Sequence, residues 1–296
     1  MKYTDNQLKT ILQDTIINDY RKNPIILLSL WDAKGEQAYI DFLLSQYEKI
    51  LLDFNKIFND TVIPKRVLEI SSFLGVVDVT LAKIGFEVHT YDIPEFQQNG
   101  NLNKLYSKYN IHPSSGYLQD VGKTGLPYPD DHFDAVILSE VLEHLSFNPL
   151  PVLQEINRTL KKGGILYITT PNQVRKTNRI NILFGLSIRN TINDSVIQLD
   201  GEKKTICGIH WREYTLLELI QLLEITGFTV STYYFSTISK TKYSIINNIL
   251  NGMMSVLMSV FFPSLENSIT IIAHKKDYKP MKFWFYNEYI KYYKNL

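Results

Sequence analysis

The chain has 296 residues, 45% of them hydrophobic, and a formal net charge of +1. Its length suits one large domain with additions, and its near-neutral charge gives no global electrostatic reason to expect a nucleic-acid partner. The single cysteine, Cys207, excludes an internal disulfide framework and a thiolate zinc cluster. The start, MKYTDNQLKT, is polar and lacks the apolar core of a signal peptide, so the cytoplasm is the expected location.

Residues 1–60 are predicted to form a helical cap ahead of the main domain. Apolar side chains recur at helical spacing over Asn6–Tyr20 and again over Glu36–Phe58. Such a cap either packs on the domain or covers a bound molecule.

The next segment has the pattern of a strand, a tight turn and a helix. Val67–Ile70 is a short apolar run that contains one acid, as expected of a buried parallel strand. Ser71 and Gly75 lie in the turn after it, where small residues let a backbone approach a ligand closely. Val76–Ile84 then has helical spacing, and Gly85 ends that helix.

A second predicted strand, Glu87–Tyr91, ends at Asp92. Acids at this position in doubly wound folds accept hydrogen bonds from ribose hydroxyls. A dinucleotide site would need three glycines in the preceding turn, so that pyrophosphate could reach the helix N-terminus, and only Gly75 is present. The pattern therefore favours a ligand that has a ribose and an adenine but no phosphate.

Two further strands are predicted later in the chain. Phe133–Leu138 is the first, and Glu140–His144 follows it, facing the same crevice as Asp92. Pro151–Lys161 has the spacing of an amphipathic helix closed by two glycines, and Ile165–Thr170 is the next strand.

These segments resemble the class I S-adenosylmethionine-dependent methyltransferases. The resemblance is carried by RVLEISSFLG, FDAVILSEVLEHL, LQEINRTLKKGGILYITTPN, HWREYTLLELIQLLEITGFTV (His210–Val230) and SITIIAHK (Ser268–Lys275), and it covers roughly residues 60–275. Serines and a phenylalanine replace the glycines that the family has in its first turn. The resemblance implies an α/β fold with a Rossmann-like, doubly wound seven-stranded sheet in the order 3-2-1-4-5-7-6.

The resemblance also implies a donor site for S-adenosylmethionine. Glu69 would orient the turn or meet the methionine amino group, and Asp92 would hold the ribose. The other implied contacts are Ser71 and Gly75 with the methionine portion, Ile93 on the adenine, Asp120 and Val121 at the adenine edge and ring, and the Ser139 backbone near the sulfonium.

The predicted organisation is a cap (1–60), a methyltransferase domain (61–275) with insertions at 172–208 and 236–267, and a tail (276–296). The basic residues of the first insertion either meet a phosphorylated acceptor or lie on a solvated loop. An uncharged stretch, 243–265, reads as core, lid or dimer surface, or as a membrane-surface contact. The tail combines lysines with aromatic residues, and packing against the body is favoured over a membrane interface or stacking on nucleic acid.

His144 is the first candidate for the general base and His210 the second. His144 follows the fourth strand into the crevice, and imidazole titrates in a useful pH range. Arg212 and Glu213 beside His210 either orient an acceptor or form a structural ion pair. No two histidines have metal-ligand spacing on a helix, so no metal site is predicted.

The leading hypothesis is O-methylation of a small, sugar-type acceptor such as a nucleotide-linked sugar or a polysaccharide precursor, because the turn LEISSFLG followed by DIPEF resembles methyltransferases encoded with bacterial surface-polysaccharide genes. The alternatives are methylation of a lipid or quinone at the membrane surface, and a non-catalytic binding protein that keeps the fold. A nucleic-acid substrate is disfavoured because an Asn-Pro-Pro-Tyr type of motif is absent, and TTPN (Thr169–Asn172) does not replace it.

Overall fold

A seven-stranded sheet organises the chain. The computed structural model describes residues 3–27, 32–59, 65–193, 208–237 and 263–276. The strand order is β3-β2-β1-β4-β5-β7-β6, which confirms the predicted order and fold class. The first five strands run parallel and β7 pairs antiparallel with both β5 and β6. The strands are β1 (Arg66–Ile70), β2 (Glu87–Asp92), β3 (His112–Ser115), β4 (Phe133–Ser139), β5 (Leu160–Pro171), β6 (Phe228–Ser236) and β7 (Ser268–Lys275).

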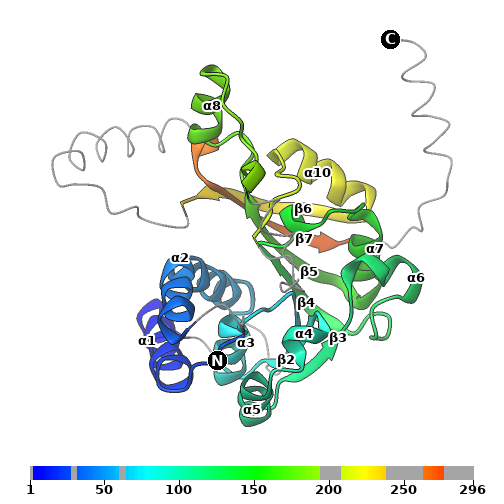
Figure 1. Ribbon diagram of the computed structural model, residues 1–296. Helices are drawn as coiled ribbons and strands as arrows, with labels where there is room; N and C mark the ends of the chain where they lie inside the picture. Colours follow the sequence, from blue (N-terminus) through cyan, green and yellow to red (C-terminus); the bar gives the residue numbers. More distant parts are fainter. Residues whose placement is uncertain (1–2, 28–31, 60–64, 194–207, 238–262, 277–296) are drawn as a thin grey trace.

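Helices cover both faces of this sheet (Figure 1). The main ones are α1 (Asp5–Thr15), the π-helix η1 (Ile16–Arg21), α2 (Ala33–Ile57), α3 (Val76–Lys83), α4 (Pro94–Gln97), α5 (Gly100–Lys108), α6 (Val121–Thr124), α7 (Leu150–Thr159), α8 (Lys176–Leu183) and α10 (Leu216–Ile225). Short 3-10 turns lie at Leu118–Asp120, Leu142–His144 and Pro263–Leu265. The cap helices, α3 and α5 share one apolar core, whereas α6, α7 and α10 share the core on the opposite face.

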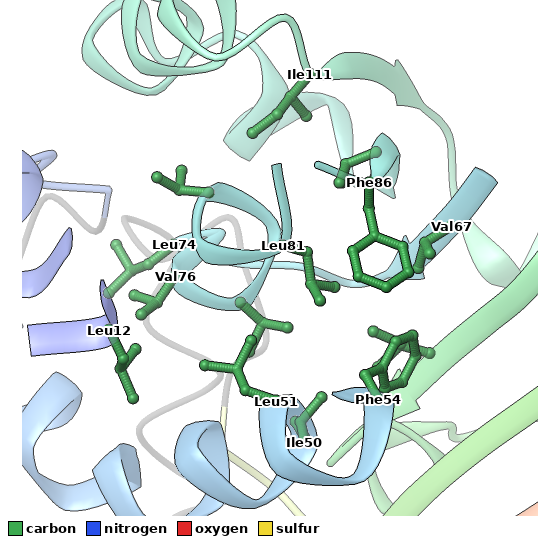
Figure 2. Close-up of a cluster of buried hydrophobic side chains, with 14 of the residues drawn as sticks. Leu12, Ile50, Leu51, Phe54, Val67, Leu74, Val76, Leu81, Phe86 and Ile111 are labelled. Carbon is green, nitrogen blue, oxygen red and sulfur yellow. The ribbon is translucent and has the colours of Figure 1, made fainter. Parts of the chain in front are cut away.

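The predicted cap is helical and packs into the first of these cores. Figure 2 shows Leu12 of α1 and Leu51 of α2 in the same cluster as Val76 of α3. The Phe54 ring of α2 packs edge-on against Phe86 and against Tyr167 of β5. Burying a side chain such as Phe54 contributes on the order of 1.5–3 kcal/mol, so this contact holds α2 firmly on the sheet. The cap is thus continuous with the main domain.

The predicted elements agree closely with the structure except around the fifth strand. The helix expected over Pro151–Lys161 ends at Thr159, and β5 begins at once at Leu160. The glycines predicted to close the helix lie inside the strand, where Gly163 has a φ of +72° and the pairing register with β4 shifts. They form an irregularity in the strand, which is a common use of glycine there.

The predictions for residues 276–296 and for most of 243–265 lie outside the described residues. Among the residues that the structure describes, no helix has both the length and the apolar character required to cross a membrane.

Candidate functional site

The predicted site residues gather at the carboxyl end of the parallel strands. Ser71 directly follows β1, Asp92 ends β2 and Ser139 ends β4, and these strands are neighbours in the sheet. Ligands in open α/β sheets bind in this crevice. The prediction that these residues share one edge is therefore reproduced by the strand pairing.

The turn after β1 keeps the backbone of a glycine-rich loop without the glycines. Ser71, Phe73 and Gly75 have φ angles of +58°, +51° and +67°, respectively. A left-handed conformation is ordinary for glycine but costs on the order of 1 kcal/mol or more for a serine or phenylalanine. The turn therefore keeps its local shape although Ser71 and Phe73 replace glycines, and the left-handed backbone at these two residues is strained.

Hydrogen bonds at Asp92 hold this strained turn. Its carboxylate accepts the backbone N–H of Phe73 at 2.8 Å and that of Ile93 at 2.7 Å. Burial raises the pKa of Asp92 to about 6, while these two donors favour the charged form. The remaining lone pairs of the carboxylate suit ribose hydroxyls, as the resemblance implies.

The cap reinforces the same turn. The Tyr20 hydroxyl donates to the Leu74 carbonyl at 2.8 Å. The Phe73 ring packs edge-on against Tyr39 of α2 and Phe96 of α4, with ring centroids 5.2 Å apart in each pair. Helices on either side of the turn thus lock the position that a glycine holds in the related family.

Gly75 has a packing role. A Cβ atom placed there would lie 2.5 Å from the Tyr106 hydroxyl, so the side chain of α5 fills the space that the glycine leaves. The Tyr106 and Ser72 hydroxyls are 3.2 Å apart. Gly75 therefore packs closely against Tyr106, and its expected contact with the methionine portion stays a prediction.

Glu69 has a buried acidic neighbour that the sequence did not single out. Asp78 on α3 is fully buried, and both its oxygens and Glu69 Oε2 lack a hydrogen-bond partner. Burial raises the pKa of Glu69 to about 7 and that of Asp78 well above its usual value. The orphaned carboxylate oxygens suit an ammonium group, which is the part of the donor that Glu69 was predicted to meet.

The remaining residues predicted to contact the donor follow β2 and β3. Ile93 is half-buried at the start of α4, and Asp120 ends the short turn after β3. Val121 is 1% exposed and belongs to the apolar core on the other face. Its predicted contact with an adenine ring stays a prediction.

The cap also reaches Ser139. Gln46 Nε2 on α2 lies 2.9 Å from Ser139 Oγ, 2.7 Å from Thr169 Oγ1 and 3.2 Å from a carboxylate oxygen of Glu140. Gln46 Oε1 has no partner in the structure. The sequence gives no signal for Gln46, because a glutamine in an amphipathic helix cannot be told from any other polar residue of that helix.

Both candidate bases lie together, although 66 residues of sequence separate them. The rings of His144 and His210 meet edge-on with centroids 4.9 Å apart. His144 Nδ1 lies 2.8 Å from the Ile209 carbonyl, and His210 Nδ1 lies 3.1 Å from Glu213 Oε1. These partners fix both Nδ1 atoms as donors when the rings are neutral, which leaves each Nε2 with a lone pair.

Glu213 is itself held in place. Arg175 and Asn178 donate to its second oxygen, Oε2. Burial raises the pKa of Glu213, but the hydrogen bonds from His210 and Arg175 outweigh it and keep the pKa below its usual value. Glu213 forms its ion pair with Arg175 and not with Arg212, which was the expected partner. A charged carboxylate that orients an imidazole is the arrangement of a general base.

A third group borders the two imidazoles. Glu143 is fully buried, accepts a hydrogen bond from Thr170 and leaves Oε1 without a partner, 4.0 Å from His144 Nε2. One ligand atom each from Glu143, His144 and His210 lies within 4.8 Å of the others. Such atoms also bind divalent ions, and an ion there would consume the lone pairs that a base needs. No metal site was predicted, because spacing along a helix cannot reveal residues from separate segments.

Comparisons with known proteins identify the family and the fold. A family model described as a methyltransferase domain matches residues 43–233, which is more than half of the chain. A ubiquinone biosynthesis O-methyltransferase of Xanthomonas oryzae pv. oryzae is 29% identical over 146 residues, which cover 48% of this chain and 56% of that relative. The same-named protein of Haemophilus ducreyi is 25% identical over 157 residues, or 52% and 64% of the two chains. The matched segment thus spans little more than half of these relatives.

Solved structures share the fold. One chain of a Haloferax volcanii complex between the Trm112 methyltransferase activator and a methyltransferase superposes with a TM-score of 0.52 at 14% identity, covering 92% of this chain and 98% of that one. A Pyrococcus horikoshii protein gives a TM-score of 0.50 at 18% identity over 82% and 92% of the two chains. At such identities the likeness supports the sheet and its helices alone.

Proposed function

This chain belongs to the methyltransferase-domain family, and we propose that it moves the methyl group of S-adenosylmethionine to a hydroxyl oxygen of a small-molecule acceptor in the cytoplasm. The observation that carries the proposal is the His210–Glu213 pair beside the carboxyl end of β4. A sulfonium donor supplies an already activated methyl group, so the protein contributes alignment, exclusion of water and removal of one proton.

The donor would be held by the turn after β1. Asp92 would accept the ribose hydroxyls, and Glu69 with Asp78 would receive the ammonium group. The strained backbone of Ser71 and Phe73 is already in the shape that a close ligand needs, so little reorganisation accompanies binding. Ser139 at the end of β4 would face the reacting end.

His210 would take the acceptor's proton. Its Nε2 accepts the proton as the acceptor oxygen forms its bond to the methyl carbon, while its Nδ1–H stays bonded to Glu213. His144 Nδ1 donates to a neutral backbone carbonyl, whereas His210 Nδ1 donates to a carboxylate that would stabilise the imidazolium once the proton is taken. We therefore assign His210 as the base and His144 as its neighbouring ring, which reverses the order in which the sequence ranked them.

A sugar-type acceptor is supported by a small polar notch next to Ser139. Its lining includes Gln46, Lys49, Thr169, Ser236 and Thr270, which are all hydrogen-bonding side chains. The notch has a volume of about 20 Å³, which is room for one water-sized group, so a single hydroxyl of such an acceptor, and not its ring, could reach the unpartnered Gln46 Oε1 there.

A quinone or lipid acceptor is the second candidate. The curated relatives carry ubiquinone biosynthesis in their names, and a phenol is the hydroxyl that such a molecule offers. The sugar-type acceptor and the quinone or lipid acceptor need the same donor site and the same base. They differ in the chemical groups that surround the methylated hydroxyl, which are polar in a sugar and apolar in a quinone or lipid.

The test begins with calorimetric titration of the protein with S-adenosylmethionine and with its demethylated product. Micromolar binding of both, followed by methylation of either nucleotide-linked sugars or catechol-type phenols, would support the proposal and select the acceptor class. A folded protein that binds neither ligand would instead favour a non-catalytic member of the family.

A further inference from the structure

An apolar patch covers α8 and the turn after it. Six of the thirteen exposed large hydrophobic side chains among the described residues lie within 180–192: Ile180, Ile182, Leu183, Phe184, Leu186 and Ile192. Leu183 is 79% exposed and Phe184 72%. Isolated exposed leucines are common, but such a concentration marks a contact surface. We call these six residues the α8 patch.

The backbone presents this patch in a fixed shape. The Leu186 N–H donates to the Asn181 carbonyl and the Gly185 N–H donates to that of Ile182, with Gly185 at a φ of +67°. These two bonds form a Schellman cap, which turns the chain back at the helix end. Leu183, Phe184 and Leu186 are therefore grouped at the tip of a helix that projects from the body beyond the end of β5 (Figure 1).

Positive charges predominate beside the patch. The part of the insertion that the structure describes, 172–193, contains Arg175, Lys176, Arg179 and Arg189 and no aspartate or glutamate, and the first acid after it in the sequence is Asp194. Arg175 is engaged with Glu213. Lys176, Arg179 and Arg189 are exposed, and the two arginines donate to backbone carbonyls. Apolar side chains flanked by cations match a surface of acyl chains beneath anionic headgroups.

We propose that the α8 patch docks this protein on an anionic lipid surface. A second copy of the chain fits less well, because a two-fold contact would place the same cations opposite one another. Inserted leucine and phenylalanine side chains would supply the apolar part of the affinity, and Lys176, Arg179 and Arg189 would supply the salt-sensitive part.

Docking through α8 would also orient the site. Arg175 directly precedes α8 and binds Glu213, which binds His210. The insertion that touches the lipid surface is thus the one that holds the base's carboxylate. This placement goes beyond the proposed reaction, and it holds for either acceptor class.

The experiment is co-sedimentation with vesicles of equal parts phosphatidylglycerol and phosphatidylcholine, and with phosphatidylcholine alone. We expect wild type to sediment with the anionic vesicles, to be released by about 0.5 M salt, and to partition roughly tenfold less when Leu183→Ser and Phe184→Ser are combined. Lys176→Gln with Arg179→Gln should weaken binding to anionic vesicles only. Leu217→Ser is the matched control, because Leu217 is 72% exposed on α10 outside the patch.

Wild-type protein that stays in the supernatant with anionic vesicles would overturn the proposal, as would an equal loss in Leu217→Ser. A wild-type dimer that the Leu183→Ser, Phe184→Ser variant converts to a monomer, with no vesicle binding, would assign the patch to a second copy instead. Calorimetric titration of each variant with S-adenosylmethionine separates these results from unfolding and from failure of the proposed reaction, since donor binding does not involve α8.

Discussion

The two halves of the crevice are built in different ways. The donor half, at β1 and β2, consists of residues close in sequence that are buried and tied by hydrogen bonds to one another and to the cap. The acceptor half, at β4, joins segments far apart in sequence, at His144, His210 and Arg175, and it borders an exposed apolar helix. The comparison teaches that the proposed donor half forms one buried unit with the cap, whereas the proposed acceptor half joins distant segments beside an exposed surface.

Replacing the base should have the largest effect. His210→Ala is expected to lower kcat by roughly 10²–10⁴-fold, the usual contribution of a general base, with donor affinity unchanged. Glu213→Gln should cost less, because His210 remains. Single-turnover rates across pH would measure both. A full loss in His144→Ala with little change in His210→Ala would restore His144 as the base.

Breaking the donor half should reduce binding of S-adenosylmethionine itself. Asp92→Ala removes the carboxylate proposed to accept the ribose hydroxyls, and hydrogen bonds to a charged group contribute about 1.5–3 kcal/mol, so the affinity should fall roughly 10- to 100-fold. The variant also leaves the N–H groups of Phe73 and Ile93 without their acceptor, which should lower stability. Calorimetry checks this, with circular dichroism as the folding control. An unchanged dissociation constant would remove Asp92 from the donor site.

The buried acids should make stability depend on pH. The folded pKa of Glu69 is about 7, above its value in the unfolded chain, so its protonated form stabilises the fold at low pH and that contribution is lost as pH rises toward and through 7. We expect Glu69→Gln to gain stability relative to wild type between pH 5 and 8, on the order of 2 kcal/mol. Urea unfolding at both pH values measures the difference, and a constant difference would contradict the assignment.

Divalent ions can test the role of the acidic and histidine side chains in the proposed acceptor half. Zinc at micromolar concentration should inhibit methyl transfer by binding Glu143, His144 and His210, and a chelator should reverse the inhibition without lowering the basal rate. Initial rates with and without chelator test this. Activity that vanishes with the chelator and returns with the metal would show that the ion belongs to the site.

The smallest expected effect concerns the strained turn. Ser71→Gly should raise the unfolding free energy by about 0.5–1 kcal/mol, because the left-handed φ of +58° is relaxed for glycine. Gly85→Ala, at a φ of +100° in the turn before β2, is the opposite control and should destabilise. Thermal unfolding of both variants gives the comparison, and a loss of stability in Ser71→Gly would show that the serine side chain matters more than the strain.

Apolar periodicity and the acid at Asp92 are local signals, so they predict individual strands and the residues at the strand ends, whereas the order of the strands is implied by the family resemblance. It could not predict Asp78, Gln46 or the grouping of Glu143 with two histidines, since those contacts arise only when α3, α2 and the segment before α10 pack together. The sequence shows that Phe73 replaces a glycine of the family, but it does not show that rings from α2 and α4 pack on Phe73 and hold the turn.

The hydrogen bond from Tyr20 to Leu74 spans 54 positions of sequence. During synthesis the cap leaves the ribosome well before the turn that it supports, and until α3 has emerged its helices can pack only on one another. At ordinary elongation rates of about 5–20 residues per second, the nascent cap therefore lacks its contact with the turn after β1 for several seconds. The turn after β1, in contrast, can contact the cap as soon as it leaves the ribosome, because the cap has already been synthesised.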